Sequence, residues 1–236
     1  MERKVEFKVG EETLRGSLFI PEGEGPFPSV IFFHGRGSTR ERYLPMAKFL
    51  SEKGMITLAF DFRGCGESDG IFENQTHRMG VEDGRAGLKF LLSQNVDKRR
   101  VGIQGTSFGG YVTGMLLNDY DFIKSIVLRV PASYSDEKLD TTVKAFEEKD
   151  FFSRWENWIG SSSYKGIGKF TGSLLVIKSK NDEVVSSEAV GKYFEDAKNV
   201  KKKKMVVQNA GHSLRDWPEA LSEFYSLTQN WFLETL

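Results

Sequence analysis

A serine stands among closely spaced glycines in the stretch Gly105-Thr106-Ser107-Phe108-Gly109-Gly110. Residues 100–104 before it suit a short buried strand, and residues 111–117 after it are apolar enough for a buried helix. Glycine two positions either side of a serine permits a sharp turn that exposes the hydroxyl in strained backbone geometry. The helix N-terminus adds backbone N–H groups that favour negative charge at the same point. The pattern indicates a serine that attacks a carbonyl, although a glycine-rich turn can also be purely structural.

An acid and a histidine follow two later strands of the expected sheet. Asp182 comes directly after the expected strand 174–177, and His212 directly after the strand 204–207. In open parallel sheets, functional groups gather at the carboxyl ends of the strands. A serine needs a base to accept its proton, and the base needs an acid that orients it. The order Ser107, Asp182, His212 therefore predicts a catalytic triad.

An oxyanion needs two hydrogen-bond donors, and the sequence offers both. One is the backbone N–H of Phe108, the residue after the serine. The other is expected from the glycine-containing loop His34-Gly35-Arg36-Gly37, which follows the strand 30–33, and we assign it to the backbone N–H of Arg36. Losing one such donor typically costs about 10²–10³ in rate. The Arg36 side chain itself is expected in solvent, with contact to an acidic substrate as the alternative.

Several neighbouring residues carry weaker signals. Glu183 and Asp216 are the alternative acids if Asp182 is only a turn residue. His34 is interpreted as structural, shaping the oxyanion loop, and His77 as solvated. Cys65 is expected to be an ordinary packed residue, with a reactive thiol as the alternative.

Apolar strand patterns alternate with amphipathic helix patterns along the chain. The expected strands are 3–9, 12–20, 29–33, 55–60, 100–104, 126–130, 174–177 and 204–207. The expected helices are 41–53, 81–92, 188–197, 219–233 and the one after Ser107. This alternation predicts an α/β fold with a mainly parallel sheet of about eight strands, an antiparallel N-terminal hairpin and helices on both faces.

Residues 134–171 interrupt this rhythm after the sixth strand, within a chain that we expect to form a single domain over residues 1–236. The segment is rich in aromatic residues. We expect it to be a small lid or cap whose rings line an apolar pocket, and the candidate pocket residues are Phe151, Phe152, Trp155 and Trp158. The alternative is that these rings pack the insert onto the core.

Composition excludes several classes of partner. Lys plus Arg and Asp plus Glu both number 33, so there is no electrostatic argument for nucleic acid or an anionic membrane surface. The charged N-terminus lacks the apolar core of a signal peptide, and the single cysteine forms no internal disulfide, so a cytoplasmic location is expected. The oligomeric state stays open, a homodimer included.

Taken together, the motifs from about residue 28 to residue 213 resemble the α/β-hydrolase superfamily. They are His34-Gly35-Arg36-Gly37, the loop Asp61–Ser68, the serine motif, Asn181-Asp182 and Gly211-His212. The small size and short insert are similar to the dienelactone-hydrolase-like and cinnamoyl (feruloyl) esterase branch. That resemblance implies a carboxylic-ester substrate and no cofactor or metal. Dienelactone hydrolases proper use a cysteine nucleophile, so serine at position 107 argues against that activity.

The sequence thus favours a serine carboxylesterase acting on small or aromatic acyl esters, with hydroxycinnamoyl esters as one option. A thioesterase or a small serine peptidase would use the same triad, as would a cofactor-free perhydrolase or haloperoxidase. The absence of a propeller-sized N-terminal segment weakens the oligopeptidase version. A non-catalytic relative that binds a small ligand is the alternative from a different class, and such relatives usually lack a member of the triad.

Overall fold

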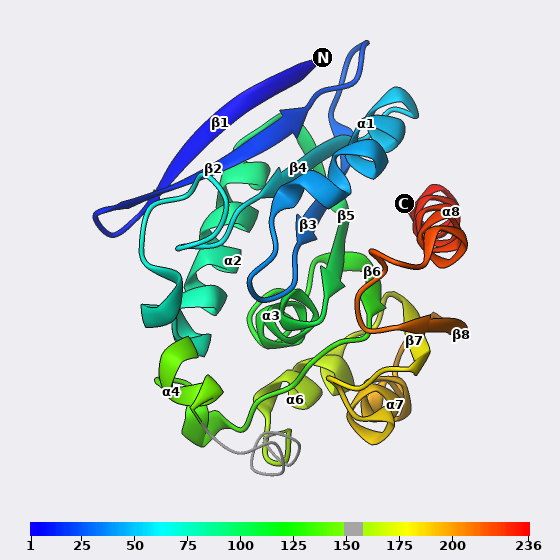
Figure 1. Ribbon diagram of the computed structural model, residues 1–236. Helices are drawn as coiled ribbons and strands as arrows, with labels where there is room; N and C mark the ends of the chain where they lie inside the picture. Colours follow the sequence, from blue (N-terminus) through cyan, green and yellow to red (C-terminus); the bar gives the residue numbers. More distant parts are fainter. Residues whose placement is uncertain (149–157) are drawn as a thin grey trace.

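The computed structural model describes residues 1–148 and 158–236, apart from the side chain of Phe146. In these residues eight strands form one sheet in the order β1-β2-β4-β3-β5-β6-β7-β8 (Figure 1). β1 pairs antiparallel with β2, and β2 antiparallel with β4, whereas all other neighbours are parallel. The strands are β1 Glu2–Val9, β2 Glu12–Phe19, β3 Phe27–Phe33, β4 Ile56–Phe60, β5 Val96–Thr106, β6 Ile123–Arg129, β7 Ser173–Asn181 and β8 Lys202–Gly211.

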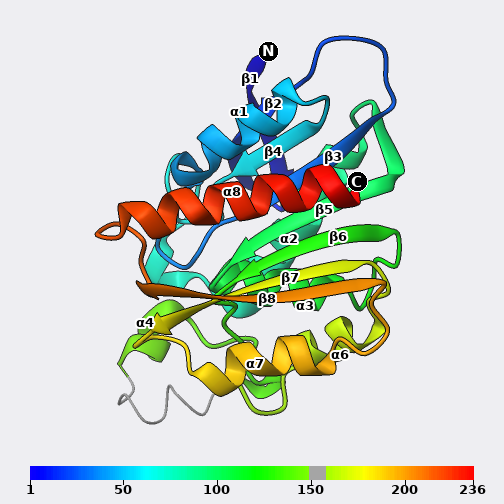
Figure 2. The ribbon, with the colours of Figure 1, turned by 90° about the vertical axis from the view of Figure 1, so that its right-hand side faces the viewer.

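Helices cover both faces of the sheet, as Figures 1 and 2 show from two sides. On one face lie α1 (Leu44–Glu52) and α8 (Pro218–Thr235), and on the other lie α2 (His77–Leu92), α3 (Phe108–Leu116), α6 (Ser162–Lys169) and α7 (Ser187–Asp196). The shorter helical segments are η1 Arg40–Tyr43, η2 Phe72–Asn74, η3 Asp136–Lys138 and α4 Val143–Glu147. The predicted α/β class, with its parallel sheet and antiparallel hairpin, is confirmed.

The two faces of the sheet explain the apolar strand sequences. Val30, Ile31, Phe32 and Phe33 in β3 are each at most 1% exposed, because their side chains enter one core on each side of the sheet. Strands covered on both faces need continuous apolar runs, unlike strands with one wet face. The central strands are therefore the most strongly specified part of the fold.

The helix that follows Ser107, α3, packs closely against α6. A Cβ at Gly166 of α6 would come 1.9 Å from the carbonyl oxygen of Gly114 in α3, so the two backbones approach each other directly. This helix lies within the segment 134–171, which is the insert expected from the sequence. The division of the chain into one domain with a lid stays a prediction.

Some element boundaries differ from expectation. The helix expected over 41–53 starts as the 3₁₀ turn η1, and α1 begins at Leu44 with Pro45 in its first turn, where a missing N–H costs nothing. α2 begins at His77, four residues before the expected start, because the side chain of Thr76 accepts the N–H of Met79 as an N-cap.

The expectation of a solvated His77 is wrong. This histidine is fully buried, its ring stacks on Tyr134 at 4.0 Å, and its Nδ1 lies 2.7 Å from the carbonyl oxygen of Lys138. Burial and the nearby positive charge of Arg36 lower the pKa of His77 to about 3, so it is neutral at physiological pH. It thus joins α2 to the segment around Tyr134.

The functional edge of the sheet is set by its topology. From β3 the chain crosses to β4 on one side, and it later returns to β5 on the other side. Such a reversal of strand order leaves a crevice at the carboxyl ends of the strands. The loop after β3, Ser107 after β5, Asp182 after β7 and His212 after β8 all start from this edge. In the described residues, no helix is both long and apolar enough to cross a membrane.

Candidate active site

Ser107 occupies a strained turn between β5 and α3. Its backbone has φ 51° and ψ −113°, in the left-handed half of the Ramachandran map that non-glycine residues seldom adopt. Such a conformation costs about 1–3 kcal/mol and persists only where neighbours enforce it. The Ser107 N–H donates to the carbonyl of Arg129 at 3.0 Å, and the Ser107 carbonyl accepts the N–H of Ala132 at 3.0 Å. The segment after β6 therefore holds the turn in place.

The three residues expected to form a triad lie in one hydrogen-bonded row. Ser107 Oγ is 3.1 Å from His212 Nε2, and His212 Nδ1 is 2.9 Å and 3.0 Å from the two carboxylate oxygens of Asp182. An ionised carboxylate only accepts hydrogen bonds, so Nδ1 is the donor and Nε2 is left to accept the serine proton. This is the arrangement required of a nucleophile, a base and an orienting acid.

Asp182 is held in its charged form. Burial would raise the pKa of this carboxyl, but the hydrogen bond from His212 and the N–H groups of Val185 and Val184 outweigh burial, and the pKa lies below its ordinary value. Of the three acids considered from the sequence, Asp182 is the one whose carboxylate bonds His212. Among the described residues, neither Glu183 nor Asp216 forms a hydrogen bond with His212.

The loop after β3 lies beside the nucleophile. A Cβ at Gly35 would come 3.5 Å from Ser107 Cβ, and Arg36 follows directly. His34 fixes this loop: the N–H of Phe62 donates to its Nε2 at 3.0 Å, and its Nδ1 lies 2.7 Å from the Gly35 carbonyl oxygen. Burial lowers the pKa of His34, so the ring is neutral and Nδ1 carries the donated hydrogen. The structural role expected for His34 agrees with these contacts.

The Arg36 side chain does not extend into solvent as expected. Its guanidinium lies over the rings of Tyr134 and Phe108, 5.0 Å and 5.3 Å from their centroids. The negative face of an aromatic ring attracts a cation, and the two rings together hold the arginine half-buried beside Ser107. Phe108 begins α3, so its N–H belongs to the helix end that favours negative charge.

A hollow of about 650 Å³ opens above Ser107 and His212. Its described lining is more polar than the aromatic pocket expected from the sequence. The charged members of that lining are Arg36, Arg42, Arg129, Arg215, Glu41 and Glu147. Tyr134 and Tyr43 contribute the aromatic rings.

None of the four pocket residues expected from the sequence is found in the described lining of this hollow. Phe151, Phe152 and Trp155 lie outside the described residues. Trp158 is described, but the structure does not bring it into the hollow at Ser107: it packs edge-to-face on Tyr164 at 6.2 Å, against the core. Sequence reasoning missed Arg42, Arg129, Arg215 and Tyr134. For Arg129 a signal exists, since an arginine directly follows the buried apolar run 126–128.

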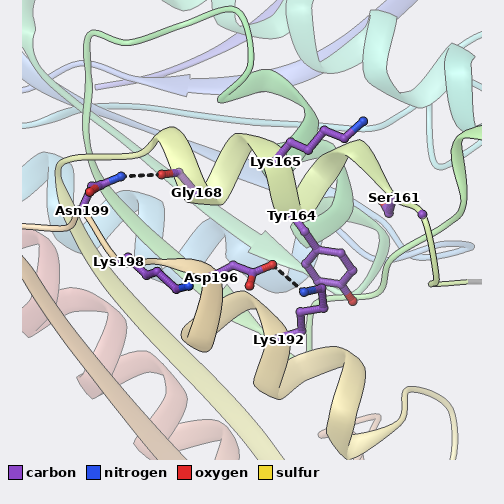
Figure 3. A pocket seen from close by; sticks show the side chains of 9 residues that line it. Ser161, Tyr164, Lys165, Gly168, Lys192, Asp196, Lys198 and Asn199 are labelled. Carbon is purple, nitrogen blue, oxygen red and sulfur yellow. Dashed lines mark hydrogen bonds and ion pairs between the residues drawn. The ribbon is translucent and has the colours of Figure 1, made fainter.

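A second hollow of about 480 Å³ lies between α6 and α7 (Figure 3). Lys192 faces Asp196 there and pairs with it at 2.8 Å, while Asn199 donates to the Gly168 carbonyl at 2.8 Å. The polar groups drawn toward one another in this hollow are thus already bonded to neighbours, and its lining contains no triad residue. Ser107 and His212 line the first hollow instead.

Eight strands in this order, with a serine turn after β5 and an acid and a histidine after β7 and β8, define an α/β hydrolase. The chain belongs to the prolyl oligopeptidase family, whose model matches residues 43–236. It is therefore a member of a hydrolase family that includes esterases and peptidases.

Individual relatives are more distant. An Escherichia coli protein, described as an uncharacterized 31.7 kDa protein in the traX-finO intergenic region, is 29% identical over 179 residues. The alignment covers 75% of this chain and 62% of that protein, so the chain spans less than two thirds of that relative's length.

Two solved structures share the fold. The esterase Pf2001 of Pyrococcus furiosus is 25% identical with a TM-score of 0.74, over 100% of this chain and 91% of that one. Est1E from Butyrivibrio proteoclasticus, solved with ferulic acid bound, has a TM-score of 0.75 over 98% of each chain. At 18% identity this second likeness shows the fold alone.

Proposed function

We propose that the protein is a serine carboxylesterase that hydrolyses small or aromatic acyl esters through an acyl-enzyme. The observation that carries the proposal is the row of hydrogen bonds from Ser107 Oγ through His212 to Asp182, with 3.1 Å and 2.9 Å at its two links. The membership of a hydrolase family that includes esterases supports it.

In the proposed acylation step, Ser107 Oγ forms a bond to the ester carbonyl carbon while its proton passes to His212 Nε2. The carbonyl oxygen becomes an oxyanion, for which the N–H groups of Phe108 and Arg36 are the proposed donors. The intermediate then collapses: the bond to the alcohol oxygen breaks, and the imidazolium of His212 gives the leaving alkoxide its proton. Asp182 stabilises the imidazolium and keeps Nδ1 protonated.

Deacylation repeats these steps with water. His212 takes a proton from a water molecule as its oxygen attacks the acyl carbon, and the second tetrahedral intermediate expels Ser107 Oγ. The proton returns to the serine, and the carboxylic acid leaves. Each residue is used twice, and the attacking water supplies the proton that replaces the one carried away by the alcohol.

Thioesters and peptides are alternative substrates because the same triad serves them. In a thioester, the C–S bond breaks and the thiol part departs as an easily expelled thiolate. In a peptide, His212 must protonate the leaving amine as the C–N bond breaks. The alternative that is not an enzyme is a non-catalytic protein that binds a small ligand. An intact hydrogen-bonded row of three residues favours the enzyme over it.

The test is hydrolysis of 4-nitrophenyl esters from acetate to decanoate, together with methyl ferulate, an acyl thioester and a peptide amide. Wild type and Ser107→Ala are compared under the same conditions. We expect ester turnover by the wild type, with its rate falling to near background in the variant. If a fluorophosphonate probe fails to label Ser107 and every substrate is left intact, the binding-protein alternative replaces the esterase.

A further inference from the structure

Arg129 is a buried arginine next to the proposed triad that the reaction above does not use. It is the last residue of β6, and only 2% of it is exposed. Its Nη1 donates to the carbonyl of His212 at 2.8 Å, and its Nη2 donates to the carbonyl of Gly211 at 3.3 Å and to Ser179 Oγ at 3.2 Å. The guanidinium therefore holds the backbone of the loop that carries His212.

The main chain of the same residue contacts the nucleophile. The carbonyl oxygen of Arg129 accepts the N–H of Ser107 at 3.0 Å. Directly after it, Val130 has φ 39°, an outlier for a β-branched residue, and donates its N–H to the Ile177 carbonyl at 2.8 Å. One residue thus bonds the serine turn through its backbone and the histidine loop through its side chain.

The charge of Arg129 has no carboxylate partner. Among the described residues no carboxylate forms an ion pair with it, its guanidinium carbon lies 5.8 Å from the centroid of the Phe224 ring, and its Nε has no hydrogen-bond partner. Burial lowers the pKa of Arg129 to about 10, so it remains a cation at neutral pH, with Tyr43, Asp182 and Arg42 as the nearby titratable or charged groups. Burying an unpaired charge is costly. A guanidinium does, however, present several N–H donors in a rigid plane, which suits two adjacent carbonyls.

We propose that Arg129 is a positioning residue that keeps the imidazole of His212 aligned with Ser107 by fixing both backbones to the end of β6. The inference rests on the proposed esterase function. Without the guanidinium, the carbonyls of Gly211 and His212 lose their donor and the histidine loop gains freedom. A misplacement of about 1 Å in a catalytic group can cost about 100-fold in rate. Substrate contacts elsewhere in the hollow would be unchanged.

The experiment compares Arg129→Met, which removes donors and charge, with Arg129→Lys, which keeps the charge but loses the planar donor set. The matched control is Arg63→Lys, a second buried arginine whose guanidinium bonds Glu12, Glu82 and Asp83 instead of the triad loops. For each variant, kcat and KM on the best 4-nitrophenyl ester, the rate of fluorophosphonate labelling and the thermal unfolding midpoint are measured under the same conditions.

We expect Arg129→Met to lower kcat about 100-fold and to slow fluorophosphonate labelling in parallel, with KM within about threefold of wild type. Arg129→Lys should recover part of kcat. Arg63→Lys should alter the unfolding midpoint alone.

The inference is overturned if folded Arg129→Met keeps the wild-type kcat and labelling rate, or if its kcat falls no further than that of the control. Should Arg129→Met fail to fold, Arg129→Lys against Arg63→Lys decides: equal kcat values overturn it, and a selective loss in Arg129→Lys supports it. A wild-type protein that neither hydrolyses an ester nor reacts with the probe instead removes the proposed function. An active wild type with unaffected variants removes only the role of Arg129.

Discussion

Gly109 lies directly against the backbone of Phe33: a Cβ placed on Gly109 would come 2.1 Å from the Phe33 carbonyl oxygen. The first turn of α3 is thereby pressed onto the end of β3 with no side chain between them. This contact sets the distance from Ser107, at the start of α3, to the loop that follows β3 and carries Gly35 and Arg36. The glycine of the serine motif is required by this contact as well as by the turn.

Gly109→Ala should therefore damage both stability and activity. The added methyl group must push α3 away from β3, and overpacking of this kind costs about 1–3 kcal/mol. Thermal unfolding and ester turnover measure the two effects. The control is Gly191→Ala in α7, where a Cβ meets only Glu195 Oε1 at 3.8 Å. Alanine there should be neutral or stabilising by about 0.5–1 kcal/mol. A fully active and stable Gly109→Ala would contradict the close contact.

Asp182→Asn should keep the shape of the site but remove its charge. The amide can donate to His212 Nδ1 and so favour the wrong tautomer, which lowers kcat by about 10⁴-fold in comparable triads. Steady-state kinetics with the best ester substrate measure the loss, with Ser107→Ala setting the background. A variant within tenfold of wild type would mean that another acid orients His212.

The same carboxylate predicts a dependence of stability on pH. The pKa of Asp182 is lower in the folded state than the value near 3.9 of an unfolded chain, so ionisation of this group favours folding. Its contribution is fully present above the unfolded pKa and is lost as the pH falls through the folded pKa. The difference in unfolding free energy between wild type and Asp182→Asn should accordingly shrink below about pH 4. Urea unfolding at several pH values checks this sign, and a difference that grows in acid would contradict it.

The charged lining of the hollow predicts a preference among esters. Arg42 and Arg215 line it and form no ion pair with a carboxylate in the described residues, and arginines outnumber glutamates in the lining. A methyl ester of a dicarboxylic acid, with its free carboxylate, should have a lower KM than the methyl ester of the monocarboxylic acid of equal length. Arg42→Gln should raise the KM of the charged ester by up to about fivefold, the value of an exposed ion pair, and leave the neutral ester unchanged. Equal effects on both esters would contradict a role for charge.

The thiol of Cys65 should be chemically unreactive, as expected of a packed residue and not of the reactive thiol that was the alternative. It is 6% exposed, and burial raises the pKa of its thiol to about 11, so very little thiolate exists at neutral pH. Iodoacetamide should leave ester hydrolysis intact, and Cys65→Ser should retain the wild-type kcat. Rapid alkylation of the folded protein, followed on intact mass, would show that the thiol is accessible.

The residues proposed for the chemistry could be found from the sequence because each stands next to a signal of its own. Ser107 follows a buried strand and has glycines two positions to either side, and Asp182 and His212 each directly follow an apolar strand. Parallel strands end at a common edge, so local order along the chain was enough to bring the three side chains together. The same alternation of apolar strands and amphipathic helices determined the α/β class.

Other features depended on contacts between distant segments, and the tertiary structure alone decided them. His77 is buried because Tyr134, which follows β6 in the chain, stacks on it. The Arg36 side chain is half-buried because its guanidinium lies over the rings of Phe108 and Tyr134. Arg129 bonds His212, which is 83 residues away in the sequence. An arginine has the same local pattern whether its partner is water, an aromatic ring or a carbonyl, and only packing determines which of them it meets.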